Sequence, residues 1–214
     1  MNSCNVFFYN TGRKVGVDAI ANYSNKFGLG RPTDIDLPQE EAGLVPNRIW
    51  KSLVKREKWY DGETINYAIG QGYLLVTPIQ MLKAANVVAQ SGELIRPYLV
   101  KQVGSVVIAE KHFKNTGISK RALDQIRTGI VKVVNDPHGT GQRAMAQGLK
   151  IAGKTGTAET SKGGAHAWFV GFSPAENAKL SMVVFIEHGG MGGYAAAELA
   201  GEIFKNAAEL GLVK

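Results

Sequence analysis

The segments Ser3–Asn5 ("SCN") and Lys154–Gly156 ("KTG") contain a serine hydroxyl, an asparagine amide and a lysine ammonium, groups that can take part in catalysis. A hydroxyl can relay a proton, an amide can orient a neighbouring group, and a lysine can place positive charge beside an anionic group. The second segment also completes the phosphate-loop pattern G-x-x-x-x-G-K-[ST], which runs from Gly148 to Thr155. The two interpretations require different elements around the lysine.

A phosphate loop needs a buried strand before it and a helix directly after it. Here the segment "GTAETSKGG" follows the lysine and threonine, and its threonines and glycines are typical of a strand that runs into a turn. We therefore expect no phosphate site. The pattern favours a KTG segment on an edge-like strand, next to open backbone, which suits a ligand that pairs as an extra strand.

The composition indicates one domain or part of one, because 214 residues with 44% hydrophobic content can fill one core without demanding two. The formal net charge is +7, and the densest basic patch, residues 48–58, is interrupted by apolar residues as on a solvated helix face. The chain lacks nucleic-acid-binding signatures, so nucleic acid is not an expected partner. The chain also contains no apolar run of 18 residues.

The single cysteine, Cys4, cannot form an intrachain disulfide, and its neighbours Phe7 and Phe8 favour a buried thiol. The histidines are not spaced as metal ligands are, so we expect no metal site.

The first two-thirds of the chain favours helices. A helical stripe from Val17 to Phe27 ends at the glycines of "GLG", and "RPTDIDLP" after it is expected to be an extended loop. In residues 77–92, Thr77 and Gln80 can form a capping box around Pro78. Residues 119–135 form a second amphipathic pattern with Ser119 as its cap. Between these helices, "LIRPYLV" and "SVVIA" are expected to be short strands or an excursion of the chain, and the turn-rich segment 136–144 a surface loop.

From residue 150 the hydrophobic period changes to two, which predicts three strands in "KIAGKTGTAET", "HAWFVGFS" and "KLSMVVFIEH". Their short connections require antiparallel neighbours. The last strand is apolar on both faces, so we expect both to be covered. A final helix follows, with an expected stripe of Leu199, Ile203, Ala207 and Leu210. The predicted fold class is α/β (α+β), an antiparallel sheet flanked by helices.

SCN and KTG match two members of the triplet S-x-x-K, S-x-[ND] and K-[ST]-G of penicillin-binding proteins and serine β-lactamases. With "GTGQRA" and the flanking segments, the chain resembles the penicillin-binding protein 2 family from residue 3 to about residue 205. These segments are "SCNVFFY", "FGLG", "IDLP", "WYDGETINYAIGQGYLLVTPIQM", "IAGKTGTAE", "HAWFVGFSPAE" and "EHGG". The resemblance implies the fold of a penicillin-recognising serine acyltransferase, with residues 1–214 as the C-terminal portion of its transpeptidase domain.

The same resemblance implies roles for individual residues. Ser3 would relay a proton to the departing D-alanine, Asn5 would orient the catalytic lysine and hold a substrate amide, and Lys154 would face the substrate carboxylate and assist the relay. The side chains of Thr155 and Thr157 would contact donor groups or the carboxylate, Gly156 would allow close approach of the backbone, and the Thr157 amide would be an oxyanion donor. The alternatives to these catalytic roles are structural: Ser3 would be a helix cap, and Lys154 would be a charge on a strand edge that deters aggregation.

The family's nucleophilic S-x-x-K should precede SCN, and only two residues stand before Ser3. One segment, Ser52–Lys55 ("SLVK"), matches S-x-x-K, but it follows SCN in the sequence instead of preceding it. We therefore expect residues 1–214 to lack both the nucleophile and the family's first two sheet strands. The isolated chain is then expected to form no acyl-enzyme. The alternatives are a non-catalytic remnant or binding module of the same fold, or a sibling D,D-carboxypeptidase or β-lactamase.

By resemblance, the intact enzyme would cross-link peptidoglycan stem peptides during cell-wall elongation and be a target of β-lactams. It would use no cofactor. It would be anchored in the bacterial inner membrane with this domain on the periplasmic side, alongside a membrane glycosyltransferase.

Overall fold

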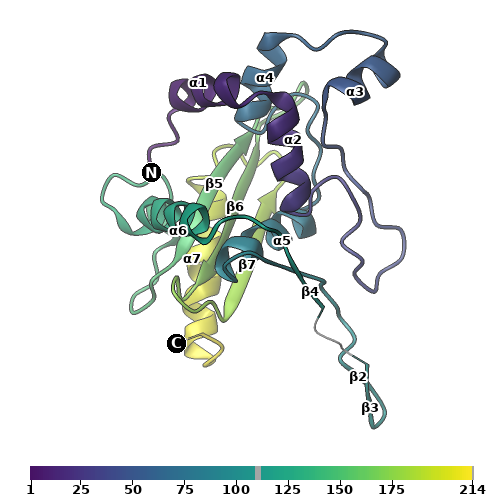
Figure 1. Ribbon diagram of the computed structural model, residues 1–214. Coiled ribbons are helices and arrows are strands. Elements are labelled where there is room, and N and C mark those ends of the chain that lie inside the picture. The colour runs from purple at the N-terminus through teal and green to yellow at the C-terminus, as the bar shows by residue number, and fades with distance from the viewer. Residues whose placement is uncertain (109–111, 214) are drawn as a thin grey trace. The chain divides into compact units, whose positions relative to one another are not determined.

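The computed structural model describes residues 1–108 and 112–213, which fold as two compact units (Figure 1). The first unit contains residues 1–3, 81–95 and the part from Phe113 onward. The second contains Cys4–Gln80 and Arg96–His112. Within the described residues, no helix has the length and apolar character needed to cross a membrane.

The first unit is built on a three-stranded antiparallel sheet of β5 (Ala152–Ala158), β6 (His166–Ser173) and β7 (Leu180–Ile186), in the order β5-β6-β7. The register places Lys154 opposite Val170 and Gly156 opposite Trp168. This confirms the three predicted strands and their antiparallel pairing. KTG therefore lies on a strand at the edge of the sheet.

Helices lie on both faces of this sheet. Figure 1 shows α7 (Ala195–Glu209) behind the strands and α5 (Pro78–Ala89) and α6 (Lys120–Asn135) in front of them. Phe169 of β6 and Phe204 of α7 are fully buried in one hydrophobic cluster. On the other face of β7, the Ser181 hydroxyl lies 2.6 Å from Oδ1 of Asn86 in α5. The expected cover on both faces of β7 is partial, because Phe185 stays 39% exposed.

The buried stripe of α7 differs from the predicted one. Leu199, Ile203 and Leu210 are exposed, and of the four predicted residues only Ala207 is buried. The other buried positions of α7 are mostly small, and small residues let the helix axis approach its neighbours closely. They are Ala196, Ala197, Ala200, Gly201 and Phe204.

The predicted caps of α5 and α6 are present. The Thr77 amide donates to Oε1 of Gln80 (2.9 Å), and the Gln80 amide donates to the Thr77 hydroxyl (3.3 Å). The Ala122 amide donates to the Ser119 hydroxyl (3.3 Å). These bonds satisfy donors that the first helical turn leaves without partners.

The second unit packs α1 (Asn5–Val15), α2 (Val17–Lys26) and α4 (Asp61–Ala68) together. Val17, Ala21 and Tyr67 form its buried cluster. At the crossing of α1 and α4, a Cβ on Gly12 would come within 2.3 Å of the Ala68 Cβ, so a larger residue does not fit there. The segment "RPTDIDLP" is an irregular loop, as expected.

The basic patch at 48–58 folds as α3 (Arg48–Trp50) and the π-helical segment η1 (Lys51–Lys55). Lys51 departs from the predicted solvated face, because its side chain is only 1% exposed. It pairs with Glu63, and its ammonium lies 4.8 Å from the Tyr60 ring centroid. Burial opposes the charged form, yet Glu63 raises the pKa of Lys51 above its ordinary value.

The buried thiol predicted from the aromatic neighbours is wrong: Cys4 is exposed, and so are Phe7 (62%) and Phe8 (42%). Cys4 stands at the N-cap position of α1 without a side-chain capping bond. Instead of covering the thiol, the two rings pack edge to face on each other with centroids 5.3 Å apart.

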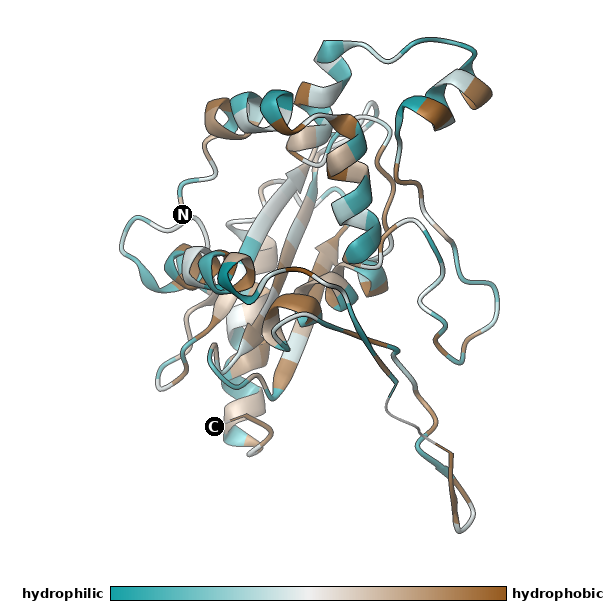
Figure 2. Cartoon of the chain, viewed as in Figure 1, coloured by the Kyte–Doolittle hydropathy of each residue, from teal (hydrophilic) through white to brown (hydrophobic). Residues whose placement is uncertain are grey.

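Short strands and one 3₁₀ turn connect the helices. In the first unit β1 (Glu93–Ile95) pairs with β4 (Phe113–Asn115), and η2 (Gln142–Ala144) is one turn of 3₁₀-helix. In the second unit β2 (Gln102–Val103) pairs with β3 (Val106–Val107) as a hairpin that shows brown, hydrophobic stretches in Figure 2. The predicted strand "LIRPYLV" thus ends early, at Ile95, before the proline.

Candidate functional site

Lys154 lies in the middle of β5 on the sheet face opposite α7. Neighbouring side chains alternate between the faces of a strand, so Lys154 and Gly156 share one face and Thr155 and Thr157 the other. Thr155 pairs in register with Phe169, which belongs to the cluster packed on α7. Burial lowers the pKa of the Lys154 ammonium, which donates a hydrogen bond to the carbonyl of Thr155. A partly desolvated cation of this kind attracts an anionic ligand more strongly than a fully hydrated one.

Thr155 is held from behind by the loop between α6 and β5. Thr155 is 8% exposed, and its hydroxyl lies 3.1 Å from the hydroxyl of Thr140. The neighbouring Gly139 has no room for a side chain, because a Cβ there would lie 2.2 Å from the Val133 carbonyl oxygen. The loop is therefore packed tightly against α6, and Thr140 of this loop holds Thr155 at the centre of the KTG segment.

Thr157 is held by a second glycine-rich loop, residues 189–193. The amide of Gly192 donates to the Thr157 hydroxyl (3.1 Å). A Cβ on Gly192 would stand 2.0 Å from the carbonyl oxygen of Gly156, so the loop crosses directly against the KTG backbone. Glycine is required here for close approach.

Ser3 belongs to the same unit as Lys154 and has two unusual properties. Its φ is 47°, a left-handed conformation that residues with side chains rarely adopt. Its hydroxyl oxygen is buried and has no hydrogen-bond partner among the described residues. The carbonyl of Met1, two residues earlier, accepts a bond from the Thr140 hydroxyl (3.4 Å). Thr140 thus contacts both the N-terminal segment and the KTG strand.

Asn5, the third residue of SCN, is the first residue of α1 and belongs to the second unit. The structure therefore brings Ser3, Lys154, Thr155, Gly156 and Thr157 into one unit and places Asn5 in the other. The alternative of Ser3 as a helix cap does not hold, because Cys4 occupies the N-cap position of α1.

Aromatic rings line the sheet beside Lys154 and Gly156. Trp168 stacks on Phe185 with centroids 4.4 Å apart, and Phe185 meets His166 at 5.3 Å. His188 continues the row, because its amide donates to Nδ1 of His166 (3.0 Å). These side chains give the face next to Gly156 an aromatic border.

Sequence reasoning missed Thr140 and Gly192 as neighbours of the KTG strand. The signals were present in "GTG" at 139–141 and "GGMGG" at 189–193, where glycine clusters mark close backbone approach as well as turns. Among the described residues, no three His, Cys, Asp or Glu side chains are grouped to hold a metal ion.

Ser52 and Lys55 of the S-x-x-K match are both exposed in η1. The Lys55 ammonium lies over the Tyr73 ring, 5.7 Å from its centroid. This surface environment does not resemble a site that activates a nucleophile by desolvation or an adjacent base.

An antiparallel sheet with KTG on its edge strand and helices on both faces defines the class of penicillin-recognising acyltransferase folds. The model of the penicillin binding protein transpeptidase domain matches residues 1–209. A curated relative, the peptidoglycan D,D-transpeptidase MrdA of Haemophilus influenzae, is 32% identical over 94% of this chain and 34% of its own length. The chain therefore belongs to the penicillin-binding protein transpeptidase family.

Solved structures agree with this assignment. The penicillin-binding protein PBP2 from Helicobacter pylori superposes with a TM-score of 0.87 at 31% identity, over 98% of this chain and 39% of that one. A chain from a peptidoglycan synthase complex that coordinates polymerization and crosslinking gives a TM-score of 0.83 at 32% identity, over 100% of this chain and 37% of that one. The chain thus spans little more than a third of the length of these relatives. The predicted resemblance and fold class are confirmed.

Proposed function

We propose that this chain is the C-terminal portion of the transpeptidase domain of a peptidoglycan D,D-transpeptidase that cross-links stem peptides during cell-wall elongation. The observation that carries the proposal is the desolvated Lys154 on an edge strand, held in place from the opposite face through Thr155 and Thr157. The reaction class is that named for the relative MrdA, a peptidoglycan D,D-transpeptidase.

The strand offers two means of holding a peptide that ends in D-Ala-D-Ala, or a β-lactam. The Lys154 ammonium provides positive charge for the terminal carboxylate. Among the described residues β5 pairs with β6 alone, so its outer edge can pair with the main chain of an extended ligand. Gly156 leaves that approach open.

The remaining roles follow from the acyl-transfer reaction. Ser3, with its buried and unpartnered hydroxyl, would pass a proton to the leaving D-alanine amine. Asn5 would orient the catalytic lysine, and the Thr157 amide would be one donor to the tetrahedral oxyanion. The nucleophilic serine would be supplied by a segment outside these residues, because Ser52 is exposed on η1.

The setting of the reaction belongs to the same proposal. A relative in this family is part of a peptidoglycan synthase complex. We expect the intact protein to work beside a membrane glycosyltransferase on the periplasmic side of the inner membrane.

A chimeric enzyme tests this function. The matching segment of the Haemophilus influenzae relative is replaced by this chain, and acylation by a fluorescent penicillin is measured. The chimera should be acylated, and Lys154→Ala should slow acylation by about 100-fold or more, the usual cost of removing a charge-stabilising donor. Lys150→Ala is the matched control, because Lys150 is an exposed lysine two residues before β5 and forms an ion pair with Glu176.

A folded chimera that is not acylated, or an equal effect of both lysine variants, would contradict the proposal. The isolated chain should form no adduct, and a stoichiometric adduct at Ser52 would be equally damaging. With a stem peptide and an acceptor amine, cross-linked product supports a transpeptidase, whereas hydrolysis alone indicates a carboxypeptidase.

A further inference from the structure

The hairpin of β2 and β3 in the second unit, defined here as residues 98–108, exposes an unusual amount of apolar surface. Val103, Val106 and Val107 are 60–62% exposed, although valines are normally buried. The remaining apolar side chains of the hairpin are also exposed: Tyr98 (41%), Leu99 (61%), Val100 (41%) and Ile108 (49%).

These side chains lie on both faces of the hairpin. Val106 and Val107 are consecutive residues of β3, so their side chains point in opposite directions. A protein groove that covers one face of a two-stranded ribbon would leave the other face in water. A medium that surrounds the hairpin would cover both.

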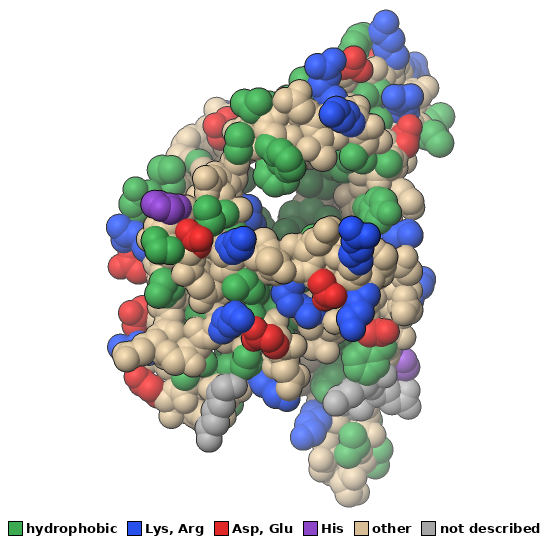
Figure 3. Space-filling model, turned by 60° about the vertical axis from the view of Figure 1, so that its left-hand side comes forward, with side chains coloured by type: hydrophobic (Ala, Val, Ile, Leu, Met, Phe, Trp, Pro, Cys, Tyr) green, Lys and Arg blue, Asp and Glu red, His purple; other side chains and the backbone are tan. Residues whose placement is uncertain are grey.

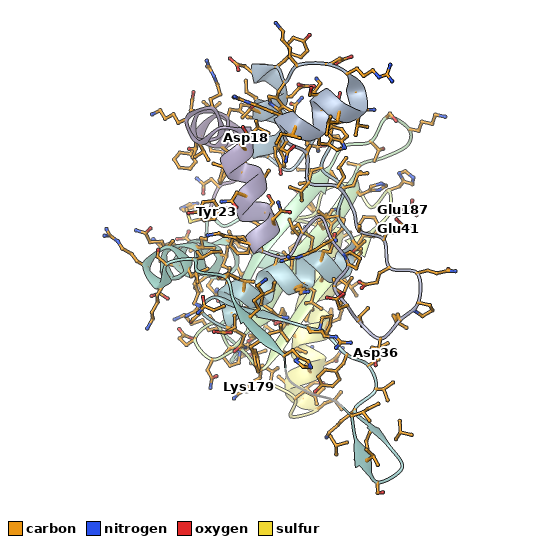
Figure 4. All side chains as sticks on the ribbon, turned by 45° about the vertical axis from the view of Figure 1, so that its right-hand side comes forward. Asp18, Tyr23, Asp36, Glu41, Lys179 and Glu187 are labelled. Carbon is orange, nitrogen blue, oxygen red and sulfur yellow. The ribbon has the colours of Figure 1, made fainter. Side chains whose placement is uncertain are left out.

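The hairpin is held in a defined shape. Gly104 has a φ of 58° in the two-residue turn between Val103 and Val106, as the tight turns of β-hairpins require. At the base, the Asp36 carboxylate accepts hydrogen bonds from the amides of Leu99 (2.6 Å) and Val100 (2.8 Å). Figure 4 labels Asp36 beside this base. Because the hairpin is held by hydrogen bonds and its valines are exposed, it is an ordered contact surface and not a frayed loop.

Lys101 is the one charged residue within the hairpin, residues 98–108. Between Glu93 and Glu110 the sequence contains no acidic residue, whereas Arg96 and Lys101 are basic. In Figure 3 the lobe below the grey residues shows green side chains with blue and no red. The Asp36 carboxylate at the base is already engaged by two backbone amides.

We propose that this hairpin inserts its tip into the interfacial region of a lipid bilayer that contains anionic lipids. The valines enter the boundary between headgroups and acyl chains, Tyr98 lies at headgroup level, and Lys101 pairs with lipid phosphate. Acyl chains surround both faces, as the two-sided apolar pattern requires. This inference does not depend on the transpeptidase assignment.

Vesicle flotation of the 214-residue chain tests the proposal. Vesicles contain phosphatidylcholine alone or with phosphatidylglycerol. The triple variant Val103→Thr, Val106→Thr and Val107→Thr keeps the β-branched shape, and should bind at least about tenfold more weakly because apolar burial is lost. Lys101→Gln should weaken binding about fivefold to the anionic vesicles only.

The matched control makes the same change at exposed valines outside the hairpin, Val6 (64%), Val15 (47%) and Val54 (60%). It should bind like the wild type. Circular dichroism checks that every variant is folded. Insertion is measured directly on Ser105→Cys in a Cys4→Ser background, with an environment-sensitive dye that lipid-borne quenchers should reach.

Equal losses in the control and hairpin triples would overturn the assignment to the hairpin. Absence of wild-type binding to either vesicle would overturn the proposal outright. A chain that ignores vesicles but forms dimers that the hairpin triple dissolves would show that the surface contacts a second copy instead.

Discussion

The hydroxyls of Thr140 and Thr155 lie 3.1 Å apart and join the loop after α6 to the centre of the KTG strand. Thr155 is almost completely buried, so its hydroxyl depends on this partner. Thr140 also donates to the Met1 carbonyl, two residues before Ser3. One side chain thereby links the two segments proposed to act on the substrate.

Thr140→Val should destabilise the chain by about 1–3 kcal/mol, because it leaves the buried Thr155 hydroxyl without its partner while keeping the side-chain shape. Urea unfolding measures the change. The double variant with Thr155→Val should cost less than the sum of the single changes, since both partners are then removed. Thr128→Val, an exposed position on α6, is the control and should stay within about 0.5 kcal/mol. Equal effects at 140 and 128 would show that the contact contributes nothing.

Lys154→Met should unfold at the same or a higher urea concentration than the wild type near pH 7, because it removes a cation that burial disfavours. The lowered pKa of Lys154 means that the unfolded chain holds this proton more tightly, so wild-type stability rises with pH from that lowered pKa to about 10.4. The advantage of the methionine variant should therefore shrink toward about pH 10. A large loss of stability near pH 7 would contradict this. Lys150→Met, at an exposed ion pair, is the comparison.

The sheet around Lys154 could be predicted because its signals are local. A period of two and turns of a few residues require antiparallel neighbours, and threonine and glycine after the lysine exclude a helix. The segment 136–144 was expected to be a surface loop for equally local reasons. Gly141 and Ala144 are nevertheless buried, since turn residues do not reveal what the turn packs against.

The stripe of α7 shows a second limit of sequence reasoning. Hydrophobicity favoured Leu199 and Ile203 as the buried positions, yet the structure buries Ala200 and Gly201. A Cβ on Gly201 would lie 2.6 Å from the Arg143 carbonyl oxygen, so close packing selects the small residues. Partners distant in sequence decide such a choice, and the periodicity of one helix cannot supply it.

Gly153→Ala should destabilise the first unit by about 1–3 kcal/mol, the usual cost of overpacking a core. The new Cβ would lie 2.3 Å from the Phe169 ring, which is fully buried and cannot move aside. Gly129→Ala is the opposite control: it lies inside α6 with no atom within 4 Å of the new Cβ, and should stabilise by about 1 kcal/mol. Thermal unfolding of both variants measures the difference. A neutral Gly153→Ala would mean that the sheet tolerates a displaced ring.

Asp36→Asn should loosen the hairpin base, because the amide side chain has one acceptor oxygen and no charge for the amides of Val100 and Leu99. Those bonds lower the pKa of Asp36 in the folded chain below its ordinary value. A lowered carboxyl pKa stabilises the fold above the unfolded value of about 3.9, and this contribution is lost as the pH falls through the folded pKa. Hydrogen exchange at Leu99 and Val100 should therefore show wild-type protection near neutral pH that weakens below about pH 4, and little protection in the variant at any pH. Asp34→Asn is the control, since Asp34 forms its hydrogen bonds through the backbone: its carbonyl accepts from Arg96 and its amide donates to Glu40. Protection that is unchanged by Asp36→Asn would show that the carboxylate does not clamp the hairpin.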